Sequence, residues 1–309
     1  MAKLSRINLQ SSQLLERSAE GTYAPETVAW AQLEPGNFEV RYGFVDASPL
    51  RLALRKMNVG FKGEASVPKE KSVIGILADP RTRARWFGAK MDARSIFSSP
   101  ARVELATSGA GSFYTISIDR HSIARDFARS PDALTLLDDL QQERLSHDPL
   151  LASRLRRLLH RSFSISHAPP RRSVSGTLIP LLASAIDRGE ERVVESSKCL
   201  NRRLTAVRRC ETYMRENVDA TLTLLDLSQV SGMRSRSLIN AFEAVTGYSP
   251  MDYLKRIRLN GVHRALQRAH RDAIRIIDVA TDWGFWHMGH FTTDYRTMFG
   301  ETPSQTLLR

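Results

Sequence analysis

The strongest constraint on this chain is a pattern that occurs twice between Asp226 and Pro303. Each copy has an acidic residue in a short apolar stretch, a glycine, two large apolar residues, a second glycine and a (Ser/Thr)-Pro pair. The first copy consists of Asp226, Gly232, Leu238, Phe242, Gly247 and Ser249-Pro250. The second consists of Asp278, Gly284, Phe291, Tyr295, Gly300 and Thr302-Pro303. A repeat of this kind, with a tight turn between two amphipathic helices, predicts two helix-turn-helix modules in one chain.

The local signals for the helix ends are consistent with this prediction. Thr223 can cap the first helix together with Asp226, and Ser249 followed by Pro250 can begin a helix that joins the two modules. That joining helix, from Pro250 to Leu266, would span about 25 Å, enough to set two reading helices about one DNA turn apart. Gly261 within it is expected to weaken the helix by roughly 1 kcal/mol relative to alanine.

The second helix of each module has a polar face opposite its apolar face. In the first module this face carries Arg236, Ile239, Asn240 and Glu243, and in the second it carries His290, Thr292, Thr293 and Arg296. Arginine can bind guanine and asparagine can bind adenine in the major groove, and isoleucine can contact a thymine methyl group. The plainer alternative is that these are exposed residues of an ordinary helical packing domain. The matched spacing of two copies favours DNA reading.

Charge and composition indicate a polyanionic partner and a cytoplasmic protein. The formal net charge is +12 and the pI is about 10.1, which suits nucleic acid or acidic lipid. Residues 205–309 hold 14 Lys and Arg against 11 Asp and Glu, so they contribute only +3. The DNA-binding end should therefore rely on a few well-placed side chains.

No apolar run approaches the ~20 residues of a membrane span, and the N-terminus has no apolar signal core.

Sequence patterns of enzymes and metal sites are missing. There is no glycine-rich phosphate loop, nucleophile elbow or HExxH string, so we expect no catalytic residue and no cofactor. His287 and His290 have the spacing of a helical metal pair but no third ligand nearby, so we expect no metal site. A DNA-repair alkyl acceptor would need an activated cysteine, and Cys199 and Cys210 have linker and helix-face contexts.

The first two-thirds of the chain change character near residue 120. Residues 26–118 contain several short alternating runs, among them Phe38 to Phe44, and indicate a sandwich or small cupin-like barrel. Leucine spacing predicts helices over 131–145 and 150–159, and 179–186 resembles one more helix. Six aromatic residues of the β region could line an apolar pocket, although aromatic residues there more often form core: Tyr42, Phe44, Trp86, Phe87, Phe113 and Tyr114.

These patterns predict an α+β protein with three segments. Residues 1–188 would form a β-rich sensor or dimerisation domain, 189–203 a linker, and 204–309 an all-α domain of two helix-turn-helix modules. A basic run precedes the linker and consists of Arg154, Arg156, Arg157, Arg161, Arg171 and Arg172. Such a run is usually a solvated face, and the alternative is a supplementary phosphate contact.

The repeat resembles the DNA-binding domain of the AraC/XylS family of bacterial transcription regulators over about residues 205 to 309. The resemblance is carried by the two Gly-x-(Ser/Thr)-Pro ends, by Arg258-Leu259 and by Gly284-Phe285. The string from Trp283 to Phe291 looks most like the ethanolamine-utilisation regulator branch. In three places the chain departs from the family pattern: Arg234 replaces the usual cap serine so that Ser235 would take over capping, Val262 replaces a small residue, and Gly289 stands where a side chain often reads a base.

The resemblance implies a sequence-specific DNA-binding protein, not an enzyme, that activates transcription. DNA contacts would fall on Arg234, Ser235, Arg236, Ile239, Asn240, His287, Gly289, His290, Thr292, Thr293 and Arg296. The implied partners are promoter DNA, RNA polymerase, a small-molecule effector bound in the N-terminal domain and a second copy in a homodimer, with no membrane. Control of the N-terminal domain by a protein partner is the alternative, and the protein would work in the cytoplasm at the nucleoid.

Overall fold

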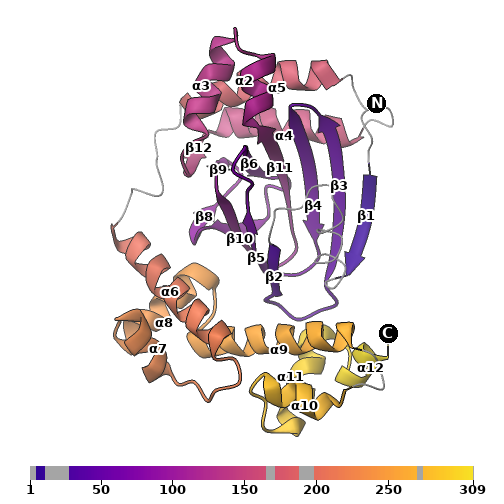
Figure 1. Ribbon diagram of the computed structural model, residues 1–309, viewed down its shortest axis with the longest axis vertical. Helices are drawn as coiled ribbons and strands as arrows, with labels where there is room; N and C mark the ends of the chain where they lie inside the picture. The colour runs from indigo at the N-terminus through magenta and orange to yellow at the C-terminus, as the bar shows by residue number, and fades with distance from the viewer. Residues whose placement is uncertain (1–4, 11–27, 165–170, 188–197, 270–273, 309) are drawn as a thin grey trace.

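The computed structural model describes residues 5–10, 28–164, 171–187, 198–269 and 274–308. An N-terminal part of β-strands with a layer of helices lies at one end of the long axis, and an all-helical C-terminal part lies at the other end (Figure 1). The observed architecture is therefore a mixed one, with a sheet-rich N-terminal region and a helical C-terminal region.

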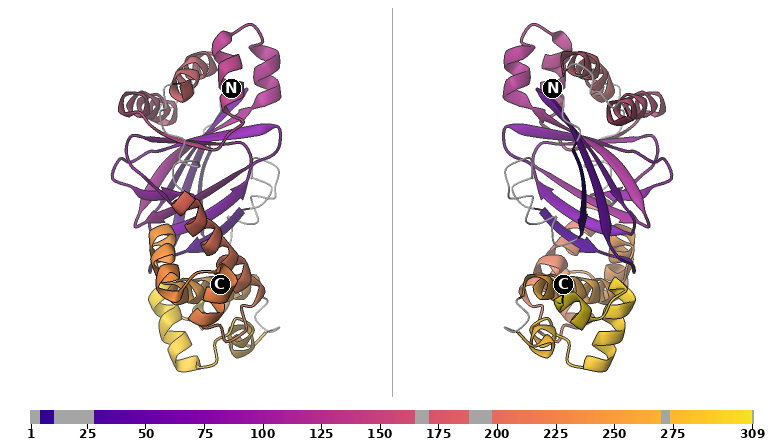
Figure 2. Two further views of the ribbon diagram at one scale, coloured as in Figure 1. Left: turned by 90° about the vertical axis from the view of Figure 1, so that its left-hand side faces the viewer. Right: turned by 90° about the vertical axis from the view of Figure 1, so that its right-hand side faces the viewer.

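Two antiparallel sheets form the N-terminal part. The larger sheet has seven strands in the order β1 (Ser5–Gln10), β3 (Glu39–Ala47), β4 (Leu50–Met57), β11 (Gly111–Asp119), β6 (Lys71–Leu77), β9 (Ser95–Ser99) and β12 (Arg144–His147). The smaller sheet has five strands in the order β2 (Val28–Gln32), β5 (Phe61–Ser66), β10 (Arg102–Ser108), β7 (Arg83–Trp86) and β8 (Ala89–Met91). Their inner faces share one apolar core, so the two sheets form a sandwich (Figure 2).

Strand β3 shows how this sandwich is covered. Val40 is buried between the sheets as its alternation predicts, but Val45 and Ala47 are buried on the opposite face. Phe44, expected on the buried face, is half-buried beneath the guanidinium of Arg51. The prediction is wrong for this end of the strand because helices cover the outer face of the larger sheet here.

That helical layer consists of α2 (Arg120–Asp126), α3 (Pro131–Asp139), α4 (Pro149–Ser164) and α5 (Arg171–Asp187). The predicted helix over 131–145 ends early, at Asp139, and Leu145 belongs to strand β12. Leu145 is buried by pairing of β12 with the edge of β9, which leucine spacing alone does not reveal. The other two expected helices, over 150–159 and 179–186, lie within α4 and α5.

Four of the six aromatic residues considered for a pocket form core. Trp86, Phe87, Phe113 and Tyr114 are all buried. Trp86 stacks on Phe97 with ring centroids 5.5 Å apart, which fills the space between the sheets near β7 and β9. Tyr42 is half-buried and lies under the guanidinium of Arg55.

The C-terminal part is a run of seven helices in the described part of the chain. They are α6 (Lys198–Glu216), α7 (Leu224–Ser231), α8 (Ser235–Thr246), α9 (Pro250–Arg268), α10 (Ile276–Asp282), α11 (Met288–Phe299) and α12 (Pro303–Leu307). Of the expected linker 189–203, residues 189–197 lie outside the described residues and 198–203 belong to α6. Among the described helices, none combines the length and apolar composition that a membrane crossing requires.

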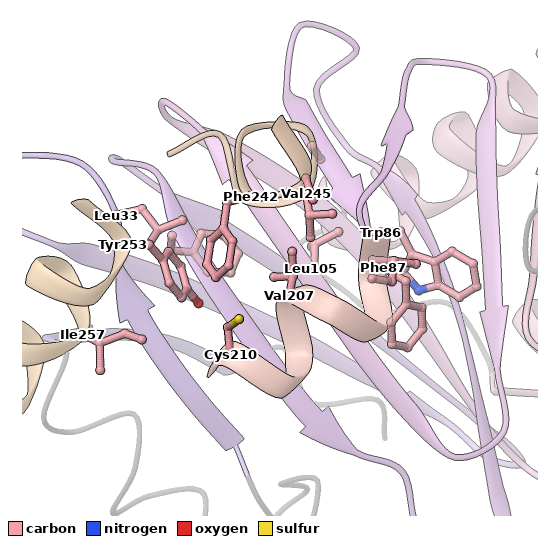
Figure 3. Packing of buried hydrophobic residues seen from close by; sticks show 14 of the residues in the cluster. Leu33, Trp86, Phe87, Leu105, Val207, Cys210, Phe242, Val245, Tyr253 and Ile257 are labelled. Atoms are coloured by element: carbon pink, nitrogen blue, oxygen red, sulfur yellow. The ribbon is translucent and has the colours of Figure 1, made fainter. Parts of the chain in front are cut away.

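The two parts share one hydrophobic core. Leu204 and Val207 of α6 and Phe242 of α8 belong to the same buried cluster as Trp86 and Leu105 of the smaller sheet. Figure 3 shows the helical and strand side chains meeting in this layer. At its edge, a Cβ on Gly88 would lie 2.8 Å from Leu204 Cδ2, so the β7–β8 turn approaches α6 as closely as glycine allows. The sandwich and the first helices of the C-terminal part are therefore packed as one body.

Candidate nucleic-acid interface

The first helix pair, α7 and α8, has well-defined ends. The Thr223 backbone N–H donates to Asp226 Oδ2 at 2.7 Å, while the Asp226 N–H donates to Thr223 Oγ1 at 3.3 Å. This capping box is the predicted one, and the hydrogen bonds from Thr223 lower the pKa of Asp226. Gly232 ends α7 with φ of +68°, a conformation that favours glycine, so the chain turns directly into α8.

The expectation that Ser235 caps α8 is wrong. The residue at the cap position is Arg234, whose side chain makes no capping hydrogen bond. Ser235 is the first residue inside the helix, and its hydroxyl lies 3.0 Å from the Ser228 hydroxyl of α7. Ser235 therefore joins the two helices of the pair.

Helix α8 separates its buried and exposed residues as its sequence predicts. Leu238, Phe242 and Val245 are buried in the shared core. Of the proposed contact residues, Arg234, Arg236 and Asn240 are exposed, and Ser235 and Ile239 are half-buried. An arginine and an asparagine four residues apart lie on the same side of a helix, so both can face one ligand.

The second pair, α10 and α11, turns at Gly284 with φ of +75°. A Cβ at this glycine would lie 2.7 Å from the Val218 carbonyl oxygen and 2.8 Å from Arg258 Cζ. Arg258 of α9 also donates to the Ala220 carbonyl oxygen at 2.5 Å. The arginine thus connects the turn of the second pair to the loop before the first pair, which gives a structural role to two residues of the sequence pattern.

Helix α11 buries Phe291, Tyr295, Met298 and Phe299. The residues expected at the DNA are all exposed: His287, Gly289, His290, Thr292, Thr293 and Arg296. The Thr292 and Thr293 hydroxyls donate to the Met288 and Gly289 carbonyl oxygens of their own helix at 2.9 and 3.0 Å. These two side chains therefore present methyl groups and acceptor lone pairs outward.

His287 and His290 lie beside each other at the start of α11. The His287 and His290 rings lie with centroids 6.5 Å apart and at right angles. Within the described residues, no cluster of three histidine, cysteine or acidic side chains could hold a metal ion.

Helix α9 joins the pairs, and Gly261 has a packing role within it. A Cβ at this position would lie 2.1 Å from the Trp283 ring, so the indole of the second pair lies directly on the helix backbone. Nearby, His263 Nδ1 lies 2.7 Å from the Tyr295 hydroxyl, which donates to Thr306 Oγ1 at 2.8 Å. Glycine at this position is therefore required for the close packing between α9 and the α10–α11 turn, whatever it costs the stability of the helix.

The N-terminal part holds the joining helix through the edge of its smaller sheet. The Gln32 backbone N–H donates to Asn260 Oδ1 at 2.9 Å, and Asn260 Nδ2 donates to the Gln32 carbonyl oxygen at 2.8 Å. The Asn260 amide thus pairs with the edge strand β2 as another strand would. Arg256 Nε donates to the Leu33 carbonyl oxygen at 2.7 Å, which adds a second point of attachment.

A third attachment reaches the end of α11. The Gly36 backbone N–H and Gln32 Nε2 both donate to the Met298 carbonyl oxygen, at 2.9 and 3.0 Å. The last carbonyl groups of a helix lack partners within the helix, so these donors satisfy one of them. The strand β2 and the loop after it therefore contact both the joining helix and the second pair.

A buried ion network lies between the parts. Lys62 of β5 contacts Glu211 of α6 at 2.5 Å and Glu104 of β10 at 3.4 Å, and all three side chains are almost fully buried. Burial alone would lower the pKa of Lys62, but Tyr253 and the surrounding carboxylates raise it well above its ordinary range. Lysine here is a permanent cation at neutral pH.

Cys210 lies close to this network, and its thiol is not activated as a nucleophile. Its thiol is buried and donates to the Leu227 carbonyl oxygen at 3.4 Å. Burial raises the pKa of Cys210 to about 11, which is the reverse of what an alkyl-accepting nucleophile needs. The side chain of Cys199, the other cysteine, lies outside the described residues.

Sequence comparison places the helical part in a known family. A profile described as a helix-turn-helix domain matches residues 227–309. The XylDLEGF operon transcriptional activator 2 of Pseudomonas putida is 34% identical over 134 residues, which cover 43% of this chain and 80% of that protein. The chain belongs to the AraC/XylS family of transcription regulators. It is thus related to DNA-binding regulators and not to enzymes.

Other proteins similar to this AraC/XylS-family chain match about a third of its length. Another P. putida XylDLEGF operon transcriptional activator is 35% identical over 95 residues, and the chain spans only 30% of its length. The crystal structure of a probable AraC family transcriptional regulator from Rhodopseudomonas palustris is 40% identical, with a TM-score of 0.31. That match covers 34% of this chain and 95% of the other.

Sequence reasoning identified the exposed faces but missed the residues that hold the two parts together. Asn260 offered a faint signal, because it is a polar residue between the apolar positions Ile257 and Val262 of one helix. Lys62 and Glu211 offered none, since each is an unremarkable charged residue in its own segment.

Proposed function

We propose that this AraC/XylS-family regulator binds promoter DNA through both helix pairs, each acting as a helix-turn-helix module. The observation that supports this most is the separation of faces on α8 and α11, where core residues alternate with exposed Arg, Asn, His and Thr residues. Helix α9, with 19 residues, is about 28 Å long, which suits two reading helices in successive major grooves.

The two modules have unequal roles in this proposal. Arg236 and Asn240 of the first module read a guanine and an adenine, and Ile239 contacts a thymine methyl group. In the second module Gly289 has no side chain, and Thr292 and Thr293 use their hydroxyl donors within the helix. The second module therefore contacts DNA phosphates and recognises DNA shape, through residues such as His290 and Arg296, more than it reads base edges.

A gel shift of the full chain with DNA from the adjacent promoter tests this assignment. Arg236→Ala and Asn240→Ala should each weaken specific binding by ~1–3 kcal/mol, roughly 5- to 150-fold, and relax the preference at one base pair. Arg129→Ala is the matched control, because it removes an exposed arginine of the N-terminal part. If both α8 variants bind the operator with unchanged affinity and base preference, the assigned reading helix is wrong.

The proposal extends to the output of the protein. Bound to its operator, the chain activates the neighbouring operon through contact with RNA polymerase, and it does so in the cytoplasm at the nucleoid, as a homodimer. Relatives named as activators of the XylDLEGF operon support the activating role. Within the family we assign the chain to the ethanolamine-utilisation regulator branch, on the string from Trp283 to Phe291. A promoter–reporter strain lacking the gene should lose expression, and increased expression would indicate a repressor.

A small molecule that binds the N-terminal domain is proposed as the controlling signal. The shared core supports this, because a ligand that shifts the smaller sheet also shifts α6 and α8. Thermal shift of the full chain against metabolite classes tests it: a true effector raises the melting temperature and changes operator affinity. A second candidate is control by a protein partner, and an arginine-lined groove between α4 and α5 favours it.

A further inference from the structure

The groove between α4 and α5 is lined by cations and apolar side chains. It has a cavity volume of about 480 Å³ and is lined by Arg154, Arg157, Leu158, Arg161, Thr177, Pro180 and Leu181. All three arginines are exposed, and none forms an ion pair with a described side chain. The described lining thus carries three positive charges and no negative one.

The arginines form a regular column. Positions 154, 157 and 161 follow the i, i+3, i+7 spacing of one helix face, so the column is about 10 Å long. Leu158 lies within it and Leu181 lies across the groove, both half-buried. Charge along one wall and apolar surface between the walls is the arrangement that receives an amphipathic helix of opposite charge.

Arg156 of the same helix has a structural role, in contrast to the three arginines of the column. It is half-buried, and its Nε donates to the Leu77 carbonyl oxygen at 2.9 Å while its Nη2 donates to the Ala93 carbonyl oxygen at 2.5 Å. Burial lowers its pKa. Arg156 holds α4 on the larger sheet, whereas the three arginines of the column make no such hydrogen bond to the described part of the chain.

Two other occupants fit the groove less well. Figure 1 places α4 and α5 at the opposite end of the long axis from α8 and α11, while α9 runs across that axis. A straight duplex that meets both helix pairs follows α9 and does not reach the groove. A second copy related by a two-fold axis would bring one arginine column against another, which is electrostatically unfavourable.

We propose that the α4–α5 groove binds an acidic amphipathic helix of a partner protein. Its carboxylates bind Arg154, Arg157 and Arg161, and its apolar side chains pack on Leu158 and Leu181. Guanidinium groups suit this role because they bind carboxylates bidentately. This deepens the second candidate for control of the regulator and does not depend on which residues read DNA.

The test measures binding of a synthetic peptide to the full chain by fluorescence anisotropy at low salt. The peptide is helical, with glutamates at i, i+3 and i+7 and leucines between them, and a scrambled peptide of the same composition is the reference. The variant R154E/R157E/R161E should lose binding by at least about tenfold, since three exposed charge pairs are reversed together. The matched control is R81E/R83E/R129E, which reverses three exposed arginines outside the groove.

Each outcome decides the matter. Tighter binding of the patterned peptide that is lost in the groove variant and kept in the control supports the proposal, provided that operator binding in a gel shift is unchanged. Equal binding by both variants, or no preference over the scrambled peptide, overturns it. A dimer that becomes a monomer only in the groove variant identifies a second copy as the occupant, and a loss of operator affinity only in that variant identifies DNA. Both results also overturn the proposal.

Discussion

Replacing Lys62 by methionine tests whether the buried ion network holds the two parts of the chain together. Methionine has a similar length and no charge. The substitution leaves Glu211, only 2% exposed, without the cation that lies 2.5 Å away. Glu104 keeps a second cation, because Arg208 lies 3.4 Å from its carboxylate. The main expected effect is therefore the loss of the nearest cation from the buried Glu211 carboxylate, which keeps its interactions with Tyr253 and Arg215.

Removing one partner of a buried ion pair costs about 3–5 kcal/mol, and we expect Lys62→Met to lower the free energy of unfolding by that amount at neutral pH. The double variant Lys62→Met/Glu211→Leu should recover most of the loss, because no buried charge is left unpaired. Arg94→Met is the control: its pair with Asp92 is largely exposed, and such pairs contribute about 0–1 kcal/mol.

The pH dependence has a definite sign. In the wild type the Lys62 pKa is raised, so the stability it contributes is fully present below about pH 10 and is lost only as the pH rises above that.

Urea unfolding followed by far-UV circular dichroism measures these differences, across a pH series for the wild type and each variant. If Lys62→Met is as stable as Arg94→Met, the network does not stabilise the contact between the parts. A double variant as unstable as the single one would assign the loss to packing and not to charge.

Three smaller perturbations follow from the same contacts. Gly261→Ala should destabilise the protein by about 1–3 kcal/mol in thermal unfolding, because the new Cβ would overlap the Trp283 ring, although alanine favours helix; an unchanged melting temperature would contradict the close packing. Asn260→Ala removes two hydrogen bonds to the backbone of Gln32 and should cost about 1–3 kcal/mol, seen as faster amide exchange of β2. Thr223→Ala removes the α7 cap and should cost about 1 kcal/mol, and unchanged stability would show that Asp226 alone suffices.

The helical part was predictable because its signals are local. Thr223, Gly232 and Ser249 each define a helix end through their own neighbours in sequence, and apolar spacing within α8 and α11 separates core from surface. Ser235 was the exception, because its partner is a side chain of the preceding helix, seven positions away, and not the backbone that a cap would bind.

The contacts between the parts could not be predicted in the same way. Lys62 and Glu211 are 149 positions apart, and each alone resembles a surface residue. Leu145 of strand β12 continues the leucine spacing of the preceding helix, and only its pairing with the edge of β9 makes this segment a strand. On β3 the alternation reveals that one face is buried at a time, but not that helices cover the second face from Gly43 onwards.

The double capping of the Met298 carbonyl oxygen has a consequence for how such regulators can be recombined. The donors come from Gln32 and Gly36, more than 260 positions away along the chain. The C-terminal end of α11 is therefore capped by residues of the N-terminal part. A chimaera that grafts residues 205–309 onto a foreign sensor would lose these donors, and it would also lose Lys62, the cation beside Glu211. The unit that can be exchanged intact is therefore the helical C-terminal part together with the smaller sheet, because the two share one core. A cut within the expected linker, 189–203, would separate residues that pack against each other.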